Sequence, residues 1–325
     1  MQNGEMMTIY LTDKEVKKLL PMDVCISLVE SVFQSEYAGH AETLPRKRIV
    51  LEKGMFHVMG GASFGVGAVG LKTYATTSEG TKFFVYLFDA VNGSLLAIIE
   101  GGELSRIRTG AATGVAAKYL SEKKESVLGI IGAGYQAEPQ IEAVLKVRNI
   151  SKINVYSRNE RKRNEFVSRV SSKFNVNLKA SDNAKSCVSD SDIVITVTNS
   201  SEPVLDSKWL KPNVFVSAVG SNHWQRRELD QMTIEEAGFI VVDNLEQAKE
   251  ECGDLIWAAS KGKFRWNTVV ELKDIVTKNR TIPNGNGIVL FESQGAGIED
   301  IASAMWVYNA ASELGLGKKL PFGKD

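Results

Sequence analysis

The sequence predicts an α/β protein built around a doubly wound parallel sheet. Its second half alternates apolar, β-prone runs with helical stretches, which is typical of parallel strands joined by crossover helices. The expected strands are Val127–Ile131, Ile153–Tyr156, Ile193–Thr198, Val214–Val219 and Phe239–Val242. Residues 48–100 instead form a series of β-prone segments without such alternation. We therefore expect two domains, with a boundary near Ser121–Glu125, before the parallel sheet begins.

The first domain is expected to open with two helices and to continue in strands. Thr12-Asp13-Lys14-Glu15 is a capping-box pattern, and Pro21 marks the start of a second helix. The residues expected on one face of that helix are Val24, Leu28, Val32 and Tyr37. Strands are expected at Phe56–Met59, Val69–Tyr74, Phe83–Phe88 and Ser94–Ile99. Asn92-Gly93 predicts a hairpin turn between the last two.

Three further features frame the parallel sheet. Glycines crowd residues Gly60–Gly70, which indicates a bend or a close approach by another element. An alanine-rich helix is expected over Leu104–Leu120 and leads into the first parallel strand. Near the end, Pro283–Gly287 predicts a loop, Ile288–Phe291 a strand and Ile298–Leu314 a helix.

A glycine turn follows the first expected parallel strand. It reads Gly132-Ala133-Gly134-Tyr135-Gln136-Ala137, and a helical stretch from Gln136 to Arg148 comes after it. In such a turn Gly132 permits the tight bend, Gly134 leaves room for a pyrophosphate, and Ala137 lets helix and strand approach closely. The helix N-terminus offers free N–H groups to the phosphates. The pattern predicts a dinucleotide site in a Rossmann-type domain; the alternative is an ordinary tight turn.

The end of the second parallel strand bears on the choice of cofactor. An acidic residue there binds both ribose hydroxyls and favours NAD, whereas an arginine accommodates a 2′-phosphate. This chain has Ser157-Arg158, 157 − 132 = 25 positions after the first glycine, and Glu160 is the first acid that follows. We expect NADP(H) to be preferred, with NAD(H) possible. The alternative is that Ser157 caps the next helix and Arg158 is merely solvated.

Composition excludes several classes of partner. Lys+Arg equals Asp+Glu at 39 each among 325 residues, which gives no electrostatic case for nucleic acid or an anionic membrane. No apolar run approaches the length of a membrane span, and no secretory signal is visible. Cys25, Cys187 and Cys252 are far apart, as expected of reduced thiols in a cytoplasmic protein. The three histidines lie at no metal-ligand spacing, so no metal is expected.

Three basic residues of the first domain stand out. Lys72 lies in an otherwise apolar strand, where a buried lysine is costly unless it is paired or functional. Arg108 falls early in a helix, where a bound anion would offset repulsion from the positive helix end. Arg48 precedes a β-prone run and could bind an anion at the strand end. The alternatives are an edge-strand lysine that reaches water, a surface arginine and a solvated basic loop.

In the second domain, polar residues follow two expected strands. Thr196–Thr198 and Gly220–Asn222 would lie together at the carboxyl edge of the sheet, where such folds bind ligands. His223 is a weaker acid–base candidate, because no nearby residue in the sequence would orient it.

These features together resemble the ornithine cyclodeaminase/mu-crystallin family, in family order over nearly the whole chain. The matching blocks are Leu71-Lys72, Leu104–Ala112, Gly132–Ala137, Asp192–Thr198 with Pro203-Val204, Ala218–Asn222 with Arg227-Glu228-Leu229, and Ser293, Gly295 and Asp300. The resemblance implies a substrate-binding and dimerisation α+β domain (1–122), an inserted dinucleotide-binding Rossmann domain (123–297), and a C-terminal helix (298–325) returning to the first domain. It also implies a homodimer.

The resemblance assigns roles to individual residues. Arg48 and Arg108 would bind the substrate carboxylate, with Arg46 as the counterpart of Arg48 if the loop aligns differently, and Lys72 would touch the carboxylate or relay a proton. The residues expected to bind the cofactor are Thr109, Gly132, Ala133, Gly134, Tyr135, Gln136, Ala137, Ser157, Arg158, Thr196, Val197, Thr198, Val219, Gly220, Ser221 and Gly295.

The implied chemistry is hydride exchange between nicotinamide and the α-carbon of a small amino or imino acid. Family members include ornithine cyclodeaminase, alanine dehydrogenase, and ketimine, pyrroline-2-carboxylate and iminosuccinate reductases. Cyclodeaminase-like members carry an Asp where this chain has Asn222. A neutral amide cannot act as a base near neutral pH, so imine reduction or oxidative deamination is expected, with Asn222 positioning the nitrogen. The alternatives are an ammonia-releasing ornithine cyclodeaminase with bound NAD and a non-catalytic mu-crystallin-like binding protein.

Overall fold

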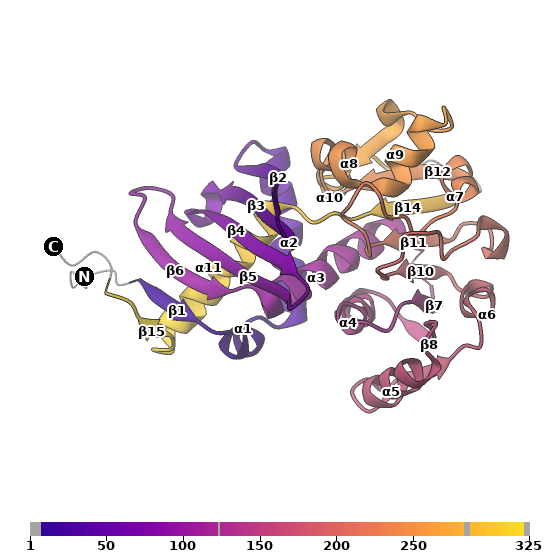
Figure 1. Ribbon diagram of the computed structural model, residues 1–325, viewed down its shortest axis with the longest axis horizontal. Coiled ribbons are helices and arrows are strands. Elements are labelled where there is room, and N and C mark those ends of the chain that lie inside the picture. The colour runs from indigo at the N-terminus through magenta and orange to yellow at the C-terminus, as the bar shows by residue number, and fades with distance from the viewer. Residues whose placement is uncertain (1–7, 123, 283–286, 322–325) are drawn as a thin grey trace. The chain divides into compact units, whose positions relative to one another are not determined.

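The computed structural model describes residues 8–122, 124–282 and 287–321. The chain forms two compact units, one from Met1–Arg108 with Ala296–Asp325 and the other from Thr109–Gly295 (Figure 1). Helix α3 (Gly102–Leu120) supplies residues to both. The expected α/β class with a parallel sheet is confirmed. None of the described helices combines the length and apolar character that crossing a membrane requires.

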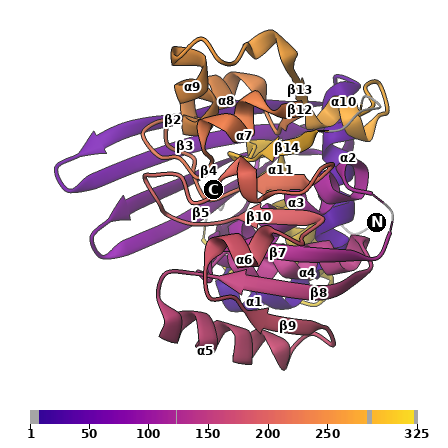
Figure 2. The ribbon, with the colours of Figure 1, turned by 90° about the vertical axis from the view of Figure 1, so that its right-hand side faces the viewer.

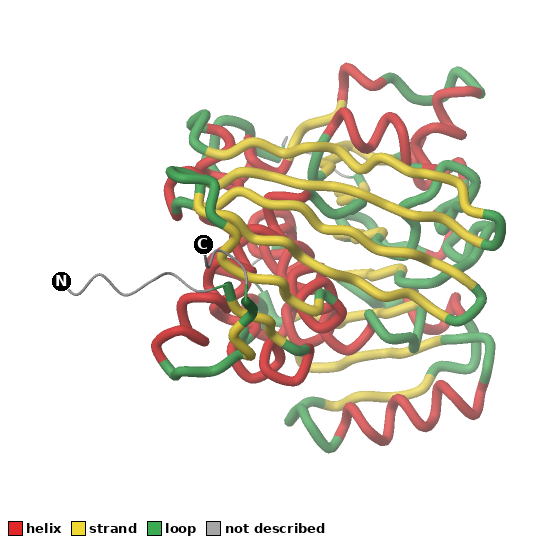
Figure 3. The backbone as a smooth tube through the Cα atoms, turned by 60° about the vertical axis from the view of Figure 1, so that its left-hand side comes forward, coloured by secondary structure: helices red, strands yellow, loops and turns green. Residues whose placement is uncertain are grey.

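The first unit is built on a seven-stranded sheet in the order β15-β1-β6-β5-β4-β3-β2. Strands β2 to β6 form an antiparallel meander, and β1 pairs parallel with β6. The strands appear as yellow bands joined by green turns in Figure 3. Their bounds are β1 Ile9–Leu11, β2 Ala41–Leu51, β3 Gly54–Ser63, β4 Ala68–Thr77, β5 Gly80–Asp89, β6 Leu95–Glu100 and β15 Lys318–Lys319.

Helices cover one face of this sheet. They are α1 (Asp13–Leu19), α2 (Met22–Tyr37) and α11 (Gly297–Glu313), with a short 3-10 turn at Phe64–Val66. The capping box at Thr12 is confirmed. Helix α11 packs on β3 and β4, and a Cβ at Gly61 would lie 2.8 Å from the backbone nitrogen of Ile298. The glycine-rich segment therefore does admit a close approach.

One helix face was predicted wrongly. The buried residues of α2 are Met22, Cys25, Ile26, Val29, Val32 and Phe33. Val32 was predicted correctly, but Tyr37 is exposed and Val24 and Leu28 are only half-buried. A helix that packs against both α11 and the sheet buries a wider stripe than one row of residues at helical spacing.

The second unit contains an eight-stranded, wholly parallel sheet in the order β13-β12-β14-β11-β10-β7-β8-β9. The chain leaves β7 in one direction through β8 and β9, and then returns to β10 on the other side. The switch point therefore lies between β7 and β10. The strands are β7 Ser126–Ile131, β8 Ile150–Tyr156, β9 Asn177–Ala180, β10 Ile193–Thr196, β11 Phe215–Ala218, β12 Ala237–Val242, β13 Val269–Glu271 and β14 Ile288–Glu292.

Connecting helices flank this sheet, and Figure 2 shows α5 beside β8 and β9. The helices are α4 Ala137–Val147, α5 Glu160–Ser171, α6 Ala184–Val188, α7 Gln231–Glu235, α8 Leu245–Glu251, α9 Gly253–Ser260 and α10 Leu272–Val276, with 3-10 turns at Ser207–Trp209 and Trp266–Thr268. The expected loop at 283–287 falls, except for Gly287, outside the described residues. Strands β10 and β11 are shorter than expected, so Thr198 and Val219 lie in the loops that follow them.

Candidate functional site

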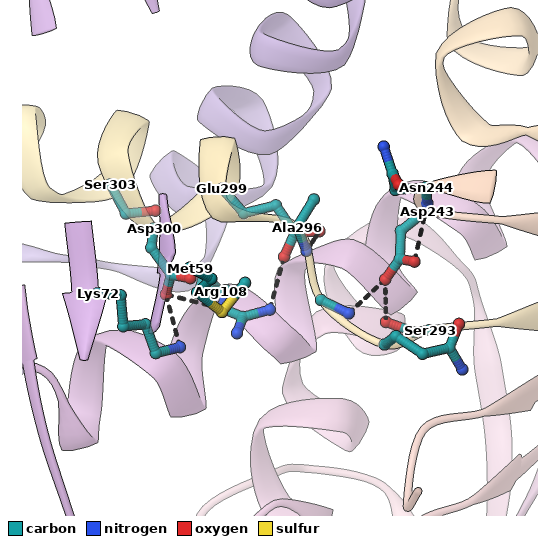
Figure 4. A network of polar contacts seen from close by, with 12 residues as sticks. Met59, Lys72, Arg108, Asp243, Asn244, Ser293, Ala296, Glu299, Asp300 and Ser303 are labelled. Atoms are coloured by element: carbon teal, nitrogen blue, oxygen red, sulfur yellow. Dashed lines mark hydrogen bonds and ion pairs between the residues drawn. The ribbon is translucent and has the colours of Figure 1, made fainter. Parts of the chain in front are cut away.

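A buried ion-pair cluster lies in the first unit (Figure 4). Lys72, on the interior strand β4, is 2% exposed, and its Nζ donates to Oδ1 of Asp300 at 2.9 Å. Arg108 donates through Nε to the same Oδ1 at 3.0 Å and through Nη1 to Oε2 of Glu299 at 2.8 Å. Both acids are fully buried in the first turn of α11, where the positive end of the helix favours negative charge.

This geometry rules out two of the alternatives that the sequence left open. Lys72 does not lie on an edge strand and does not reach water, and Arg108 is not a surface arginine. The sequence indicated a bound anion near Arg108, and the structure supplies two protein carboxylates there, Glu299 and Asp300. Those acids fix the plane of the guanidinium, because a guanidinium presents its donors in a rigid fork.

The cluster lowers the basicity of its lysine. Burial is the largest cause and the charge of Arg108 the next; together they lower the pKa of Lys72 to about 7, although Asp300 acts in the opposite direction. The charge of Arg46 is another of the causes of this lowered pKa. Lys72 is therefore able to gain and lose a proton near neutral pH, as an acid–base group must.

Arg46 and Arg48 lie on the same face of the sheet as Lys72. A bulge between Leu44 and Lys47 places Arg46 beside Met59, whose sulfur accepts from Nη2 of Arg46 at 3.4 Å. Met59 is directly opposite Lys72. Arg46 is 2% exposed, whereas Arg48 is half-buried. Arg48 lies opposite His57, which is two residues before Met59 on β3.

Aromatic side chains adjoin this cluster. The ring of His57 stacks on that of Tyr74 with centroids 4.1 Å apart, and Tyr74 contacts Phe83. The Nζ of Lys72 lies 5.4 Å from the centroid of the Phe83 ring. Such surroundings restrict water and strengthen charge interactions around the lysine.

In the second unit, a cavity of about 540 Å³ opens at the carboxyl ends of the parallel strands. Gly132 has φ +129°, and a Cβ there would collide with the carbonyl oxygen of Val197. A Cβ on Gly134 would meet no atom within 4 Å, so the space beside that residue is open. The cavity is lined by Ile131, Gly132, Ala133, Gly134, Tyr135, Gln136, Tyr156, Ser157, Arg158, Asn159, Lys162, Val197, Thr198, Asn199, Ser200, Val204, Val219 and Gly220.

The end of β8 contributes cations to this cavity. Arg158 and Lys162 both line it, and Lys162 was not singled out from the sequence. The cap of α5 is Asn159, whose side chain accepts from the backbone N–H of Lys162 at 2.9 Å. The alternative that Ser157 caps this helix is therefore wrong.

Five residues expected to bind the cofactor are not among the described lining residues. The described part of the cavity lining does not include Thr109, Ala137, Thr196, Ser221 or Gly295. Ala137 begins α4 and Thr196 ends β10, each directly beside lining residues. Gly295, with φ +80°, donates its N–H to Asp243 and its carbonyl accepts from Nε2 of Gln247 at 2.7 Å.

Asn222 and His223 lie in the loop after β11. Asn222 is exposed, and His223 accepts at Nδ1 from the backbone N–H of Gln225 at 3.3 Å. Among the described residues, no group of three or more His, Cys, Asp or Glu is arranged to hold a metal ion. The residues of this unit fit a dinucleotide. The glycine turn, the open space at Gly134 and the N-terminus of α4 together form a cradle for its phosphates.

One unit contains a parallel sheet with a cavity beside its glycine turn, and the other contains buried basic residues. These two features define a class of two-domain α/β proteins. The chain belongs to the ornithine cyclodeaminase/mu-crystallin family, whose model matches residues 6–315. The family predicted from the sequence is thereby confirmed.

Three relatives give the similarity in detail. The chain is 33% identical to a Delta(1)-pyrroline-2-carboxylate reductase of Bacillus cereus, over 97% of this chain and all of that protein. It is also similar to the structure of Thermococcus litoralis Delta(1)-pyrroline-2-carboxylate reductase in complex with NADH and L-proline, with a TM-score of 0.92 and 33% identity over 96% and 100% of the two chains. An archaeal alanine dehydrogenase dimer with bound NAD gives a TM-score of 0.91 and 31% identity over 97% and 99%.

Proposed function

We propose that this chain is an NAD(P)-dependent oxidoreductase of a small α-amino or α-imino acid, of the alanine dehydrogenase or imine reductase type. The observation that carries the proposal is the buried Lys72–Arg108–Asp300 cluster, in a chain that also has a cavity beside the glycine turn of its parallel sheet. The relatives support it, since they are named as a pyrroline-2-carboxylate reductase and an alanine dehydrogenase.

Guanidinium groups would bind the substrate carboxylate. Arg108 is held in one orientation by Glu299 and Asp300, and Arg46 is buried near Lys72. A carboxylate prefers the planar fork of arginine, and a preorganised arginine loses little freedom on binding. The sequence favoured Arg48 beside Arg108, with Arg46 as the alternative. Because Arg46 is the buried one of the two, we propose Arg108 and Arg46 as the principal ligands and keep Arg48 as the alternative.

Lys72 would hold and move the proton. When bound, the nicotinamide supplies hydride in reduction and accepts it in oxidation. Lys72 donates its Nζ proton to the substrate nitrogen in the reductive direction and takes it back in the other. Its pKa of about 7 suits both tasks. Asn222 would position the nitrogen by a hydrogen bond; because an amide is no base near neutral pH, ornithine cyclisation is disfavoured.

The proposal also concerns which residues hold the cofactor and which form of it is preferred. The residues proposed to hold the dinucleotide are those of the cavity lining and their neighbours, and NADP(H) is proposed as the preferred form. Arg158 and Lys162 support that preference, since both line the cavity after β8, where the 2′-phosphate would lie. The similar solved structures contain NADH and NAD, so NAD(H) is retained as a possible cofactor.

A homodimer is also proposed. The sheet face opposite α11 has an apolar hollow whose lining includes Phe56, Leu71, Phe84, Tyr86 and Phe88. An exposed apolar surface of this kind is typical of a protein–protein interface and supports the proposal. The alanine dehydrogenase it resembles is a dimer. Sedimentation equilibrium should give a dimer, and Leu71→Glu should give a monomer. A wild-type monomer would contradict the proposal.

The chain is further proposed to act in the cytoplasm. Its three cysteines are buried and form no disulfide, and burial raises the pKa of the Cys25 and Cys187 thiols to about 12. Such thiols are unreactive structural groups.

The proposed function is tested by initial-rate oxidation of NADPH, and separately of NADH. The substrates are pyruvate with ammonia, pyrroline-2-carboxylate, and oxaloacetate with ammonia as a source of iminosuccinate. Rapid oxidation with one of them identifies the substrate class. Ammonia release from ornithine without such oxidation would show a cyclodeaminase. Tight cofactor binding with no turnover would show a binding protein.

A further inference from the structure

A buried glutamate joins the loops that surround one end of the nucleotide cavity. Glu228 is 1% exposed and lies outside the cavity lining. Its Oε1 accepts from the backbone N–H of Thr198 at 2.6 Å. Its Oε2 accepts from the backbone N–H of Gly220 at 2.7 Å and from the hydroxyl of Thr196 at 2.9 Å. The side chain of Thr198 also hydrogen-bonds this carboxylate. All of these donors are neutral groups, and two of them are main-chain groups.

The main chain of the same residue holds a third segment. The carbonyl oxygen of Glu228 accepts from the N–H groups of Val204 and Leu205 at 2.8 and 3.1 Å. Its own N–H donates to Oδ1 of Asp254 at 3.1 Å, which fixes Glu228 from the start of α9. One residue thus ties the ends of β10 and β11 to the segment around Val204.

These three segments all line the cavity, at one side of the switch point. Val197–Ser200, Val204 and Val219–Gly220 follow or adjoin β10 and β11, whereas Ser157, Arg158 and Lys162 follow β8. In a doubly wound sheet the dinucleotide lies across the switch point, with the adenosine on the side of the second strand. The segments tied by Glu228 would therefore face the nicotinamide half.

We propose that Glu228 is a positioning residue for the nicotinamide half of the dinucleotide: its carboxylate sets the loops that hold that half, without touching the cofactor. This inference rests on the proposed cofactor site. Packing supports it, because a Cβ on Gly220 would collide with the Glu228 carboxylate and with the backbone of Thr198. The loops therefore have little freedom to move while the carboxylate is in place.

The carboxylate is needed because an amide cannot satisfy all of its donors. In Glu228→Gln either orientation of the amide places an NH₂ group against a backbone N–H, of Thr198 or of Gly220. Thr196→Val is a milder test. Thr196 is fully buried outside the cavity lining, and the change removes its hydroxyl donor to Glu228 while preserving side-chain shape. A matched control is Asp192→Asn, which alters a carboxylate that accepts from Val127 N–H at 2.9 Å before β10 begins, at the opposite end of that strand.

The test measures dissociation constants of NADPH and of adenosine 2′,5′-bisphosphate, a fragment that lacks the nicotinamide half, with thermal unfolding of each variant. Glu228→Gln should weaken NADPH about tenfold or more and change fragment binding less than about twofold. Asp192→Asn should leave both unchanged.

The remaining outcomes are decisive. If Glu228→Gln weakened the binding of NADPH and of the fragment equally, the role of Glu228 would be merely structural. An unchanged affinity for NADPH would also overturn the inference. If Glu228→Gln does not fold, Thr196→Val decides: a loss confined to NADPH supports the inference, and an unchanged affinity overturns it. A wild-type protein that binds neither molecule would overturn the preference for NADP(H), and the same comparison would then be made with NADH and adenosine 5′-monophosphate. A wild-type protein that binds none of the four would overturn the proposed function itself.

Discussion

Lys72 and Arg108 share one acceptor, Oδ1 of Asp300, at 2.9 and 3.0 Å. Two cations that meet at one oxygen repel each other, and this repulsion is the second cause, after burial, of the lowered pKa of Lys72. A substrate carboxylate bound beside the two cations would add a second negative charge and relieve their repulsion. Substrate binding and the protonation of Lys72 are therefore expected to be coupled.

That coupling predicts how anion affinity depends on pH. Without ligand the pKa of Lys72 is about 7. A bound carboxylate favours the charged form of Lys72 and therefore raises its pKa. At a pH between the pKa of the free protein and that of the complex, ligand binding takes up a proton. Affinity for pyrrole-2-carboxylate should be constant well below pH 7 and fall by up to about tenfold per pH unit above it. Inhibition constants measured from pH 5.5 to 9 check this; a flat or rising profile would contradict it.

Lys72→Met should abolish most turnover while leaving the cofactor bound. Methionine preserves much of the buried volume but carries no proton, so kcat should fall by about 10²- to 10⁴-fold. The dissociation constant of NADPH, measured by fluorescence, should stay within about twofold. Lys14→Met, at an exposed position of α1, is the control and should be neutral. Loss of cofactor affinity together with turnover would count against the proposed role of Lys72.

The two arginines of β2 can be distinguished by paired variants. Arg46 is buried and acts electrostatically on Lys72, whereas Arg48 is half-buried and further along the sheet. Arg46→Met should raise the KM for the imine substrate about 10- to 100-fold, as loss of a charge-assisted hydrogen bond does. Arg48→Met should raise it much less. The reverse order would assign the carboxylate to Arg48.

Arg158→Ala should discriminate between cofactors. If Arg158 binds the 2′-phosphate, its loss weakens NADPH about 10- to 100-fold and NADH less than about threefold. Lys162→Ala should act in the same direction, since Lys162 lines the same end of the cavity. Arg161→Ala is the control, because Arg161 is 80% exposed and pairs with Glu165. Equal weakening of NADPH and NADH by Arg158→Ala would exclude the preference for NADP(H).

Much of this fold could be predicted because its signals are local. The alternation of strands and helices and the glycine turn at Gly132 each depend on neighbouring residues, and the parallel sheet follows from them. Edge strands β9 and β13 were not predicted, because they are only 4 and 3 residues long and largely exposed or half-buried. Such strands are stabilised by pairing more than by their own residues.

The partners of the site residues could not be predicted from local patterns. Lys72 meets Asp300 across 228 positions of sequence, and Arg108 meets Glu299 across 191. The burial of Arg46 depends on a bulge in β2 that no spacing signals. Glu228 was visible only as part of a family motif, because its role lies in backbone N–H groups that every residue but proline carries.

The central claim is hydride transfer between nicotinamide and the α-carbon of an imino acid, and isotope transfer tests it most directly. Pyrroline-2-carboxylate would be incubated with NADPH deuterated at the transferred position, and separately with deuterated NADH, and the product analysed by mass spectrometry and NMR. The account predicts proline with a single deuterium at the α-carbon. Proline without deuterium, or ammonia from ornithine with no reduction of any imine, would contradict it.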